Sequence, residues 1–304
     1  MESQKYQLSR GILPVVQMPY HEDFTIDFDC LEAEVNYAFA CGANGIVFAL
    51  ASELLRLTNE ERREVASFLV RTSSNRGSVV ISVGAESTFA AVEYARHAAS
   101  IGATALMAIP PLSASLDDKE LRSYYEAILA ASPLPLIVQD ASSYVGKPMS
   151  AAFQSSLFTE HTGRVGFKPE ASPVGPVISE INAATQNSAA IYEGSGGTML
   201  VENYRRGIAG TMPGTDLLEA IVALWHALEA GDSERIYGLS PLIGSILALA
   251  VGLDGYLAVE KHLMVRHGIF RNTLVRGPVG FRLDEAATLE LDRLYDRLQV
   301  VLRQ

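Results

Sequence analysis

The sequence predicts an α/β protein, namely a (β/α)8 TIM barrel with a C-terminal helical extension. Within residues 1–230, eight short apolar segments rich in β-branched residues alternate with longer segments that have helical spacing. The short segments are almost continuously apolar, which is typical of parallel strands buried on both faces. Residues 231–304 contain no clear segment of this kind. Eight similar strand–helix units favour a closed barrel. The alternative is a doubly wound open sheet, but such a sheet gives no reason for eight similar units.

The predicted strands are apolar runs bounded by turn residues. In chain order they are GILPVVQM (11–18), GIVFAL (45–50), SVVISVG (78–84), ALMAIP (105–110), PLPLIVQD (133–140), RVGFKPE (164–170), AAIYEG (189–194) and GIAGTMPG (207–214).

Each strand precedes a segment with the apolar periodicity of a helix. These segments are residues 28–42, 58–73, 87–102, 116–131, 150–158, 174–184, 198–207 and 216–231. Thr58 and Glu61 form a predicted capping box, and Gly42 ends the first helix. About three more helices should follow, the last over residues 284–302. No low-complexity linker intervenes, so residues 1–230 and 231–304 are expected to form one domain.

The composition narrows the possible partners. The chain has 304 residues, 48% of them hydrophobic, and a net charge of −11. This charge argues against nucleic acid and membrane surfaces as partners, although a local pocket can still be positive.

Cys30 and Cys41 are expected in the core, without a disulfide framework. With no signal peptide recognised and the apolar stretch 243–253 too short to span a bilayer, we expect a cytoplasmic protein.

The active site of a (β/α)8 barrel lies at the C-terminal ends of its strands. The polar residues predicted near those ends are Gln17, Tyr20, Ser52, Glu53, Glu86, Gln139, Asp140, Lys168, Glu170, Glu193, Ser195 and Thr211. Side chains alternate along a strand, so Lys168 and Glu170 should face one side and Pro169 the other. In a water-poor pocket, a lysine can attack a carbonyl and form an imine. The alternative is that Lys168 only forms an ion pair with Glu170 or another carboxylate.

A glycine-rich segment, EGSGGT (193–198), follows the seventh strand. It matches neither a dinucleotide fingerprint nor a P-loop. The backbone N–H groups around Gly194, Ser195 and Gly196 could nevertheless bind a carboxylate or a phosphate at a helix start. The six histidines are scattered without a metal-binding spacing, so neither a metal site nor a cofactor is expected.

Five motifs can be compared with known families: the GI-LPVVQMP opening, GANGIV, the LTNEER helix start, the PLIVQD strand and the GFK strand. Together they resemble the dihydrodipicolinate synthase/N-acetylneuraminate lyase family, and the resemblance covers essentially the whole chain. Members of this family are Schiff-base lyases that act on pyruvate and other 2-oxo acids. The resemblance implies that Lys168 forms the imine with the substrate, and it implies a homodimer or homotetramer.

The chain departs from the family pattern at two strand ends. ALASELL (49–55) stands where the family has Gly-Thr-Thr-Gly-Glu-Ser, so Glu53 is kept and Ser52 could supply a hydroxyl. Gln139 and Asp140 stand in the usual Tyr-Asn-x-Pro position, so the relay tyrosine is missing. The ASE, VQDA and FKxE motifs look instead like 2-keto-3-deoxy sugar-acid dehydratases, especially those acting on L-2-keto-3-deoxyarabonate.

The expected function is therefore dehydration or aldol cleavage of a 2-keto-3-deoxy sugar acid, a small-molecule 2-oxo acid. Lys168 and Glu170 are the predicted catalytic residues, with Glu170 as the general acid/base. The predicted substrate-binding residues are Ser52, Glu53, Gln139, Asp140, Gly194, Ser195 and Gly196. Two alternatives stay open: condensation of pyruvate as in dihydrodipicolinate synthase, and a catalytically silent homologue that binds a 2-oxo acid.

Overall fold

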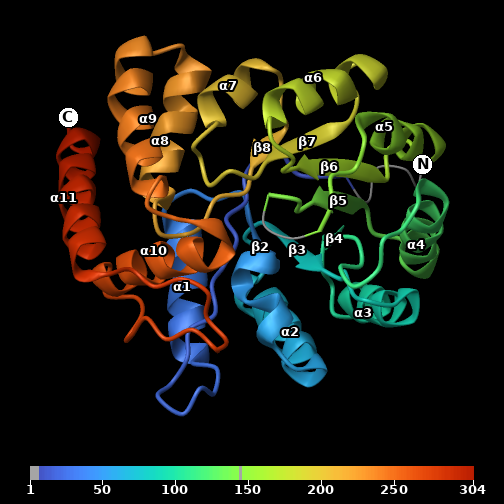
Figure 1. Ribbon diagram of the computed structural model, residues 1–304, viewed down its shortest axis with the longest axis horizontal. Helices are drawn as coiled ribbons and strands as arrows, with labels where there is room; N and C mark the ends of the chain where they lie inside the picture. The colour runs from blue at the N-terminus through green and yellow to red at the C-terminus, as the bar shows by residue number, and fades with distance from the viewer. Residues whose placement is uncertain (1–6, 144–145) are drawn as a thin grey trace.

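The computed structural model describes residues 7–143 and 146–304, and its centre is a ring of eight parallel strands (Figure 1). The strands are β1 (Gly11–Ile12), β2 (Gly45–Phe48), β3 (Ser78–Ser82), β4 (Ala105–Ala108), β5 (Leu136–Asp140), β6 (Val165–Pro169), β7 (Ala190–Glu193) and β8 (Gly210–Thr211). They pair in the order β1-β8-β7-β6-β5-β4-β3-β2. A bridge between Val15 and Val47 closes the ring, and the Val16 N–H donates to the Val47 carbonyl over 3.0 Å. The predicted barrel is confirmed.

The first predicted strand is longer than the regular ladder of β1. After Ile12 the chain stays paired with the segment that follows β8. The Leu13 N–H donates to the Thr211 carbonyl over 2.9 Å, and the Val15 N–H donates to the Pro213 carbonyl over 2.7 Å. Pro14 has no N–H to donate, so this stretch cannot form a regular ladder on both sides.

A helix follows each strand, as predicted. These helices are α1 (Phe28–Ala40), α2 (Asn59–Ser73), α3 (Thr88–Ser100), α4 (Asp118–Ala131), α5 (Ala151–Glu160), α6 (Val174–Ala184), α7 (Leu200–Arg205) and α8 (Leu218–Ala230). The capping box of α2 is present, since Thr58 accepts from the Glu61 N–H and Glu61 accepts from the Thr58 N–H. Two short 3-10 helices, η1 (Leu50–Ser52) and η2 (Leu54–Arg56), lie between β2 and α2.

The last part of the described chain is helical, with α9 (Ser233–Leu247), α10 (Gly252–Arg266) and α11 (Glu285–Leu302). Helix α9 packs between α8 and α11, while α10 contacts η1 at the mouth of the barrel (Figure 1). No single helix of the described residues could cross a membrane by its length and composition. Only α9 and α10 together pass that test, and they meet at a bend of 116°.

One hydrophobic cluster fills the inside of the barrel, and a larger one lies between the outer face of the barrel and the helices. Val47 and Ala49 belong to the inner cluster, whereas Ile46 and Phe48 belong to the large cluster beneath the helices. The same alternation sends Phe167 outward on β6 and therefore turns Lys168 inward. The inner cluster fills the lower barrel, so an inward side chain at the end of a strand lies over a packed floor.

Candidate active site

Lys168 and Glu170 lie at the carboxyl end of β6, on the same side of the chain as the alternation predicts. The Lys168 amine donates a hydrogen bond of 2.9 Å to Oε1 of Glu170. Both side chains are almost fully buried. Because Pro169 lies between them with its ring on the opposite side, no intervening side chain separates the two charged groups.

Gln139 completes this cluster from the neighbouring strand. It pairs in register with Lys168 across β5 and β6, and its Nε2 donates to Oε2 of Glu170 over 2.7 Å. Each carboxylate oxygen of Glu170 thus accepts one hydrogen bond. Burial raises the pKa of Glu170, although Lys168 and the hydrogen bond from Gln139 oppose this effect. Glu170 therefore holds a proton more readily than an exposed glutamate does.

These three side chains line a cavity at the mouth of the barrel, with a volume of about 40 Å³. The other lining residues come from the ends of neighbouring strands, from η1 and from α10. They are Val15, Ala49, Leu50, Ala51, Gly194, Gly196, Met212, Pro213, Gly214, Leu253, Tyr256 and Glu260. Among the described residues around this cavity, Lys168 is the only lysine or arginine. Its amine is therefore the one group there that could form an imine with a ketone.

Gly194 brings the end of β7 close to this lysine. A Cβ atom at position 194 would lie 2.8 Å from Cε of Lys168 and 2.7 Å from Oε1 of Glu170. Atoms cannot approach so closely, and both groups are buried with little room to move. The glycine at this position is thus required by the close approach of the chain to Lys168.

The glycine-rich segment is only partly directed at the lysine cavity. Gly194 and Gly196 line it, but Ser195 does not. Both the N–H and the hydroxyl of Ser195 donate to Glu193, and the same hydroxyl accepts from the Met199 N–H over 2.9 Å. Glu193 also accepts from the Thr211 hydroxyl. In this structure, the donors of Ser195 are therefore engaged by a carboxylate of the chain itself.

Ser52 and Asp140 also lie outside the lining of the lysine cavity. The hydroxyl of Ser52 donates to the Val16 carbonyl and accepts from the Ala49 N–H, which binds η1 to the segment that follows β1. Asp140 accepts from the Ser142 N–H over 3.0 Å and from the Met149 N–H over 2.8 Å. Both side chains therefore bind backbone groups of nearby segments rather than facing this cavity.

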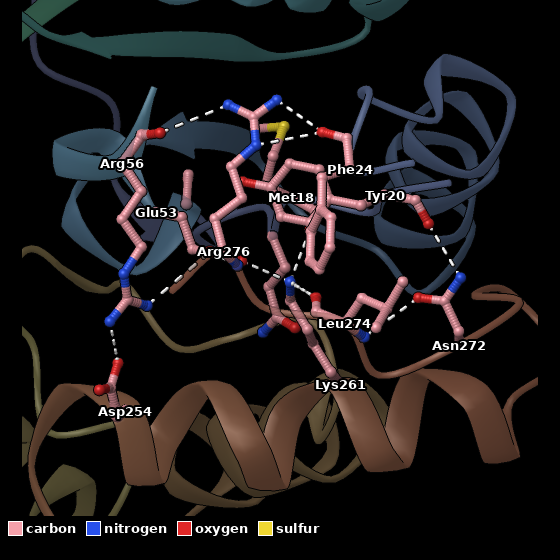
Figure 2. Close-up of polar contacts among 12 residues, drawn as sticks. Met18, Tyr20, Phe24, Glu53, Arg56, Asp254, Lys261, Asn272, Leu274 and Arg276 are labelled. Carbon is pink, nitrogen blue, oxygen red and sulfur yellow. Dashed lines mark hydrogen bonds and ion pairs between the residues drawn. The ribbon is translucent and has the colours of Figure 1, made fainter. Parts of the chain in front are cut away.

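Glu53 belongs to a buried polar network that packs against α10 (Figure 2). It is 2% exposed, and its carboxylate accepts from the amine of Lys261 and from the Arg276 N–H. Lys261 also donates to the carbonyls of Met18 and Leu274. Burial lowers the pKa of Lys261, while the charge of Glu53 opposes this effect. This network attaches α10 to the segments that follow β1 and β2, and that attachment positions α10 over the mouth.

A group of three buried carboxyl groups beside the cavity was not among the predicted site residues. Glu260 on α10 lines the cavity, Asp216 follows β8, and Glu34 lies on α1. A Cβ atom on Gly214 would lie 2.5 Å from an oxygen of Glu260 and 2.5 Å from an oxygen of Asp216. The two carboxyl groups thus flank the same glycine.

Burial favours the protonated forms of these three carboxyl groups. Burial raises the pKa of Glu34 to about 8 and that of Asp216 to about 7. Burial and the charges of Asp216 and Glu34 raise the pKa of Glu260 well above its usual value. Oε2 of Glu260 has no hydrogen-bond partner among the described residues. In the sequence, the adjacent Glu260 and Lys261 interrupt a largely apolar helical segment, which marks this position as unusual. The sequence does not show which face of that helix meets the barrel.

The chain is similar to proteins of one family along most of its length. The model of the dihydrodipicolinate synthetase family matches residues 8–296. A 4-hydroxy-tetrahydrodipicolinate synthase from Phenylobacterium zucineum is 35% identical over 130 residues, which are 42% of this chain and 44% of that protein. The "probable 2-dehydro-3-deoxy-D-pentonate aldolase YjhH" from Escherichia coli K12 is 27% identical over 173 residues, which are 57% of this chain and 58% of that protein.

Solved structures share the fold. The crystal structure of YagE, a protein of the dihydrodipicolinic acid synthase family from Escherichia coli K12 in complex with pyruvate, matches with a TM-score of 0.88. The two chains are 21% identical, and the match covers 96% of this chain and 99% of that one.

Proposed function

The chain belongs to the dihydrodipicolinate synthetase family of lyases, and on this premise we propose that it forms an imine between Lys168 and a 2-oxo acid. We further propose that it dehydrates or cleaves a 2-keto-3-deoxy sugar acid. The observation that carries the proposal is the buried amine of Lys168, which lies in the barrel mouth and donates to Glu170. Because a direct hydrogen bond joins Lys168 and Glu170, a proton can pass between them without a bridging water molecule.

In the first step, the amine of Lys168 attacks the ketone carbon of the substrate. Glu170 accepts a proton from the ammonium form, which frees the lone pair of the amine. The carbonyl oxygen then leaves as water, taking one proton from the amine and one from a neighbouring acid, so that the imine stays protonated. Glu170, once protonated, is placed to return that proton, and its raised pKa supports this role.

The protonated imine then withdraws electrons from the third carbon. In a dehydration, a base removes a proton from this carbon, and the enamine expels the hydroxyl of the fourth carbon as water after protonation. In an aldol cleavage, a base removes the proton of that hydroxyl, and the bond between the third and fourth carbons breaks to give an aldehyde and the enamine of pyruvate. Gln139 stands where the family has a relay tyrosine, and an amide does not relay protons as a phenol does. Glu170 therefore serves as the acid/base of either course.

The relatives support this class of substrate. YjhH is named for a 2-keto-3-deoxy acid, and YagE was solved with pyruvate, the 2-oxo acid that such a cleavage releases. The synthase from Phenylobacterium zucineum supports instead a condensation that starts from pyruvate. All these reactions share the imine at Lys168, so the imine is the first property to test.

The test is reduction with borohydride in the presence of pyruvate, followed by peptide mass analysis. We expect the reduced adduct on the peptide that carries Lys168 and none on the peptide that carries Lys261. Lys261 is an internal control, because it is equally buried but its amine is bound by Glu53 and by two carbonyls. The Lys168→Arg variant should form no adduct. An unmodified Lys168 with every 2-oxo acid tested would overturn the proposal and favour a catalytically silent homologue.

A second measurement separates the reactions. Incubation with a panel of 2-keto-3-deoxy acids should release pyruvate if the chain is an aldolase. It should convert a 2-keto-3-deoxypentonate into a semialdehyde, without pyruvate, if the chain is a dehydratase. Condensation would instead consume pyruvate in the presence of an aldehyde.

A further inference from the structure

Among the described residues, two carboxyl groups line the lysine cavity, and the protein bonds them very differently. Both oxygens of Glu170 accept hydrogen bonds, one from Lys168 and one from Gln139. Glu260 reaches the cavity from α10 and is 4% exposed. Its Oε2 has no hydrogen-bond partner among the described residues. An unpaired buried carboxylate is costly, so the structure favours a Glu260 that holds a proton.

Asp216 lies next to Glu260 and is in the same situation. A Cβ atom on Gly214 would lie 2.5 Å from one oxygen of each residue, so these two oxygens are at most twice that distance apart. Asp216 is buried, and its Oδ2 also lacks a hydrogen-bond partner within the described chain. Two buried carboxyl groups this close rarely ionise together. One proton between them removes a charge and can join them by a hydrogen bond.

The lysine next to this pair is not available to neutralise it. The amine of Lys261, which follows Glu260 on α10, donates to one carboxylate and to two backbone carbonyls. An ammonium group has three protons to donate, and these three acceptors use them all. The amine of Lys168 donates to Glu170. A shared proton, rather than an ion pair with Lys261, is therefore what can neutralise the pair of Asp216 and Glu260.

The electrostatics of the pair agree with this arrangement. Burial, and after it the charges of Asp216 and Glu34, raise the pKa of Glu260 well above its usual value, whereas the charges of Lys261 and Lys168 lower it. Burial also raises the pKa of Asp216 to about 7. The pair can thus hold a proton near neutral pH, where an exposed carboxyl group is ionised.

We propose that Asp216 and Glu260 share one proton, and that Glu260 delivers it to the substrate oxygen that leaves as water when the imine forms. The inference rests on the proposed function, since it concerns the imine at Lys168. Glu170 can return only the proton that it has accepted, so Glu260 is a second donor beside it. Asp216 is a positioning residue, because it acts on the substrate only through Glu260.

The step is balanced within the site. The bond between the former ketone carbon and its oxygen breaks with both electrons on oxygen, and the nitrogen lone pair of Lys168 forms the C=N bond. The leaving oxygen takes the proton of Glu260 and departs as water, which leaves Glu260 ionised beside Asp216. Hydrolysis of the imine at the end of the cycle reverses this step. The attacking water then returns a proton to Glu260.

The test measures how fast the imine forms with pyruvate, by borohydride quenching after set times at a series of pH values. Asp216→Asn removes the charge that holds the proton on Glu260. The loss of rate toward high pH should therefore begin about one pH unit lower or more in this variant. At low pH, where Glu260 is protonated in both proteins, the rates should differ by less than about threefold. Glu260→Gln should be slower by about tenfold or more at low pH and should lack this loss.

Two further variants distinguish a shared proton from a general disturbance of the fold. Adding Asp216→Asn to Glu260→Gln should not move the pH dependence, because the group on which Asp216 acts is gone. Asp27→Asn is the matched control. Asp27 is also a buried aspartate, which caps α1 and pairs with Arg271, but it does not line the lysine cavity. Its variant should keep the pH dependence of the unaltered protein.

The inference is overturned if Asp216→Asn leaves the pH dependence in place or moves it to higher pH. It is also overturned if the shift appears in the Glu260→Gln background. Should Asp216→Asn not fold, Glu34→Gln takes its place with the same expected direction, because the charge of Glu34 also raises the pKa of Glu260. The proposed function fails separately, namely when pyruvate gives no adduct at Lys168 at any pH.

Discussion

The Lys168 amine lies 2.9 Å from Oε1 of Glu170, and the two side chains are only 5% and 4% exposed. Neither charge is solvated, so the pair depends on its own contacts and on the hydrogen bond that Gln139 donates to Glu170. Burial disfavours the ionised glutamate, while the neighbouring lysine favours it. The balance leaves Glu170 easier to protonate than an exposed glutamate, which is the property that a group exchanging a proton with Lys168 needs.

Replacing Glu170 by Gln should slow turnover without abolishing binding. The amide can still accept a hydrogen bond from Lys168, but it cannot take up or release a proton. We expect kcat to fall at least about 100-fold, with a much smaller change in KM. Steady-state kinetics with the acid found in the substrate screen measures both. Normal turnover in this variant would remove Glu170 from the proposed acid/base role.

Glu260 should act as a second proton donor at the mouth. Its pKa is raised by burial and by Asp216 and Glu34, and lowered in part by Lys261 and Lys168. In the protonated form it can assist Glu170 in supplying the proton that leaves with water during imine formation. Glu260→Gln should therefore lower kcat/KM by about tenfold or more, and the loss of activity toward high pH that comes from this group should disappear.

The control for Glu260 is Asp254→Asn on the same helix. Asp254 forms an ion pair with Arg56 and contributes to the docking of α10, but it does not line the lysine cavity. If Asp254→Asn reproduces the kinetic effect and its pH dependence, Glu260 acts only by positioning α10.

The carboxyl of Glu34 predicts how stability varies with pH. Burial raises its pKa from 4.5 in the unfolded chain to about 8 in the folded protein. Between these values the folded state binds more protons than the unfolded state. The contribution of Glu34 to the free energy of unfolding should therefore decrease as pH rises from about 4.5 to about 8, by at most about 1.4 kcal/mol per pH unit. Asp216, whose pKa is raised to about 7, adds in the same direction.

Urea unfolding at a series of pH values measures this dependence. Glu34→Gln should make the free energy of unfolding less dependent on pH over this range. Glu32→Gln on the same helix is the control, because Glu32 is exposed and should leave the dependence unchanged. Equal slopes for the unaltered protein and Glu34→Gln would contradict a neutral, buried Glu34.

The ion pair of Glu53 and Lys261 should contribute to stability. Lys261→Met leaves the carboxylate of Glu53 buried with fewer partners, and we expect a loss of about 3–5 kcal/mol in the free energy of unfolding. The double variant Lys261→Met/Glu53→Gln should recover part of this loss, as a double-mutant cycle by urea unfolding would reveal. If Glu53 also contacts substrate, Glu53→Gln should raise KM for pyruvate; an unchanged KM would limit Glu53 to the network in Figure 2.

The residues at the strand ends show where the alternation of side chains along a strand predicts their direction and where it does not. The alternation along β6 predicts Lys168 and Glu170 on the same side of the chain, because side chains of a strand repeat every two residues, and the two side chains do lie together. The same rule distinguishes Gln139, which lines the cavity, from Asp140, which holds the loop after β5. Beyond the regular strand, at Ser52 and Glu53, the rule no longer applies. Glu53 has a φ of 54°, and its side chain is bound in the network beneath α10.

The sequence by itself determined the eight strand–helix units, the helical C-terminal part and the lysine at the end of β6, because these follow from local periodicity along the chain. The tertiary structure decided that Glu260 lies against the lysine cavity. Glu260 is on a helix, and the residue that a helix presents to its neighbour changes with the rotation and shift of the helix axis. Those parameters depend on packing among segments far apart in the chain, such as the ion pair of Lys261 with Glu53.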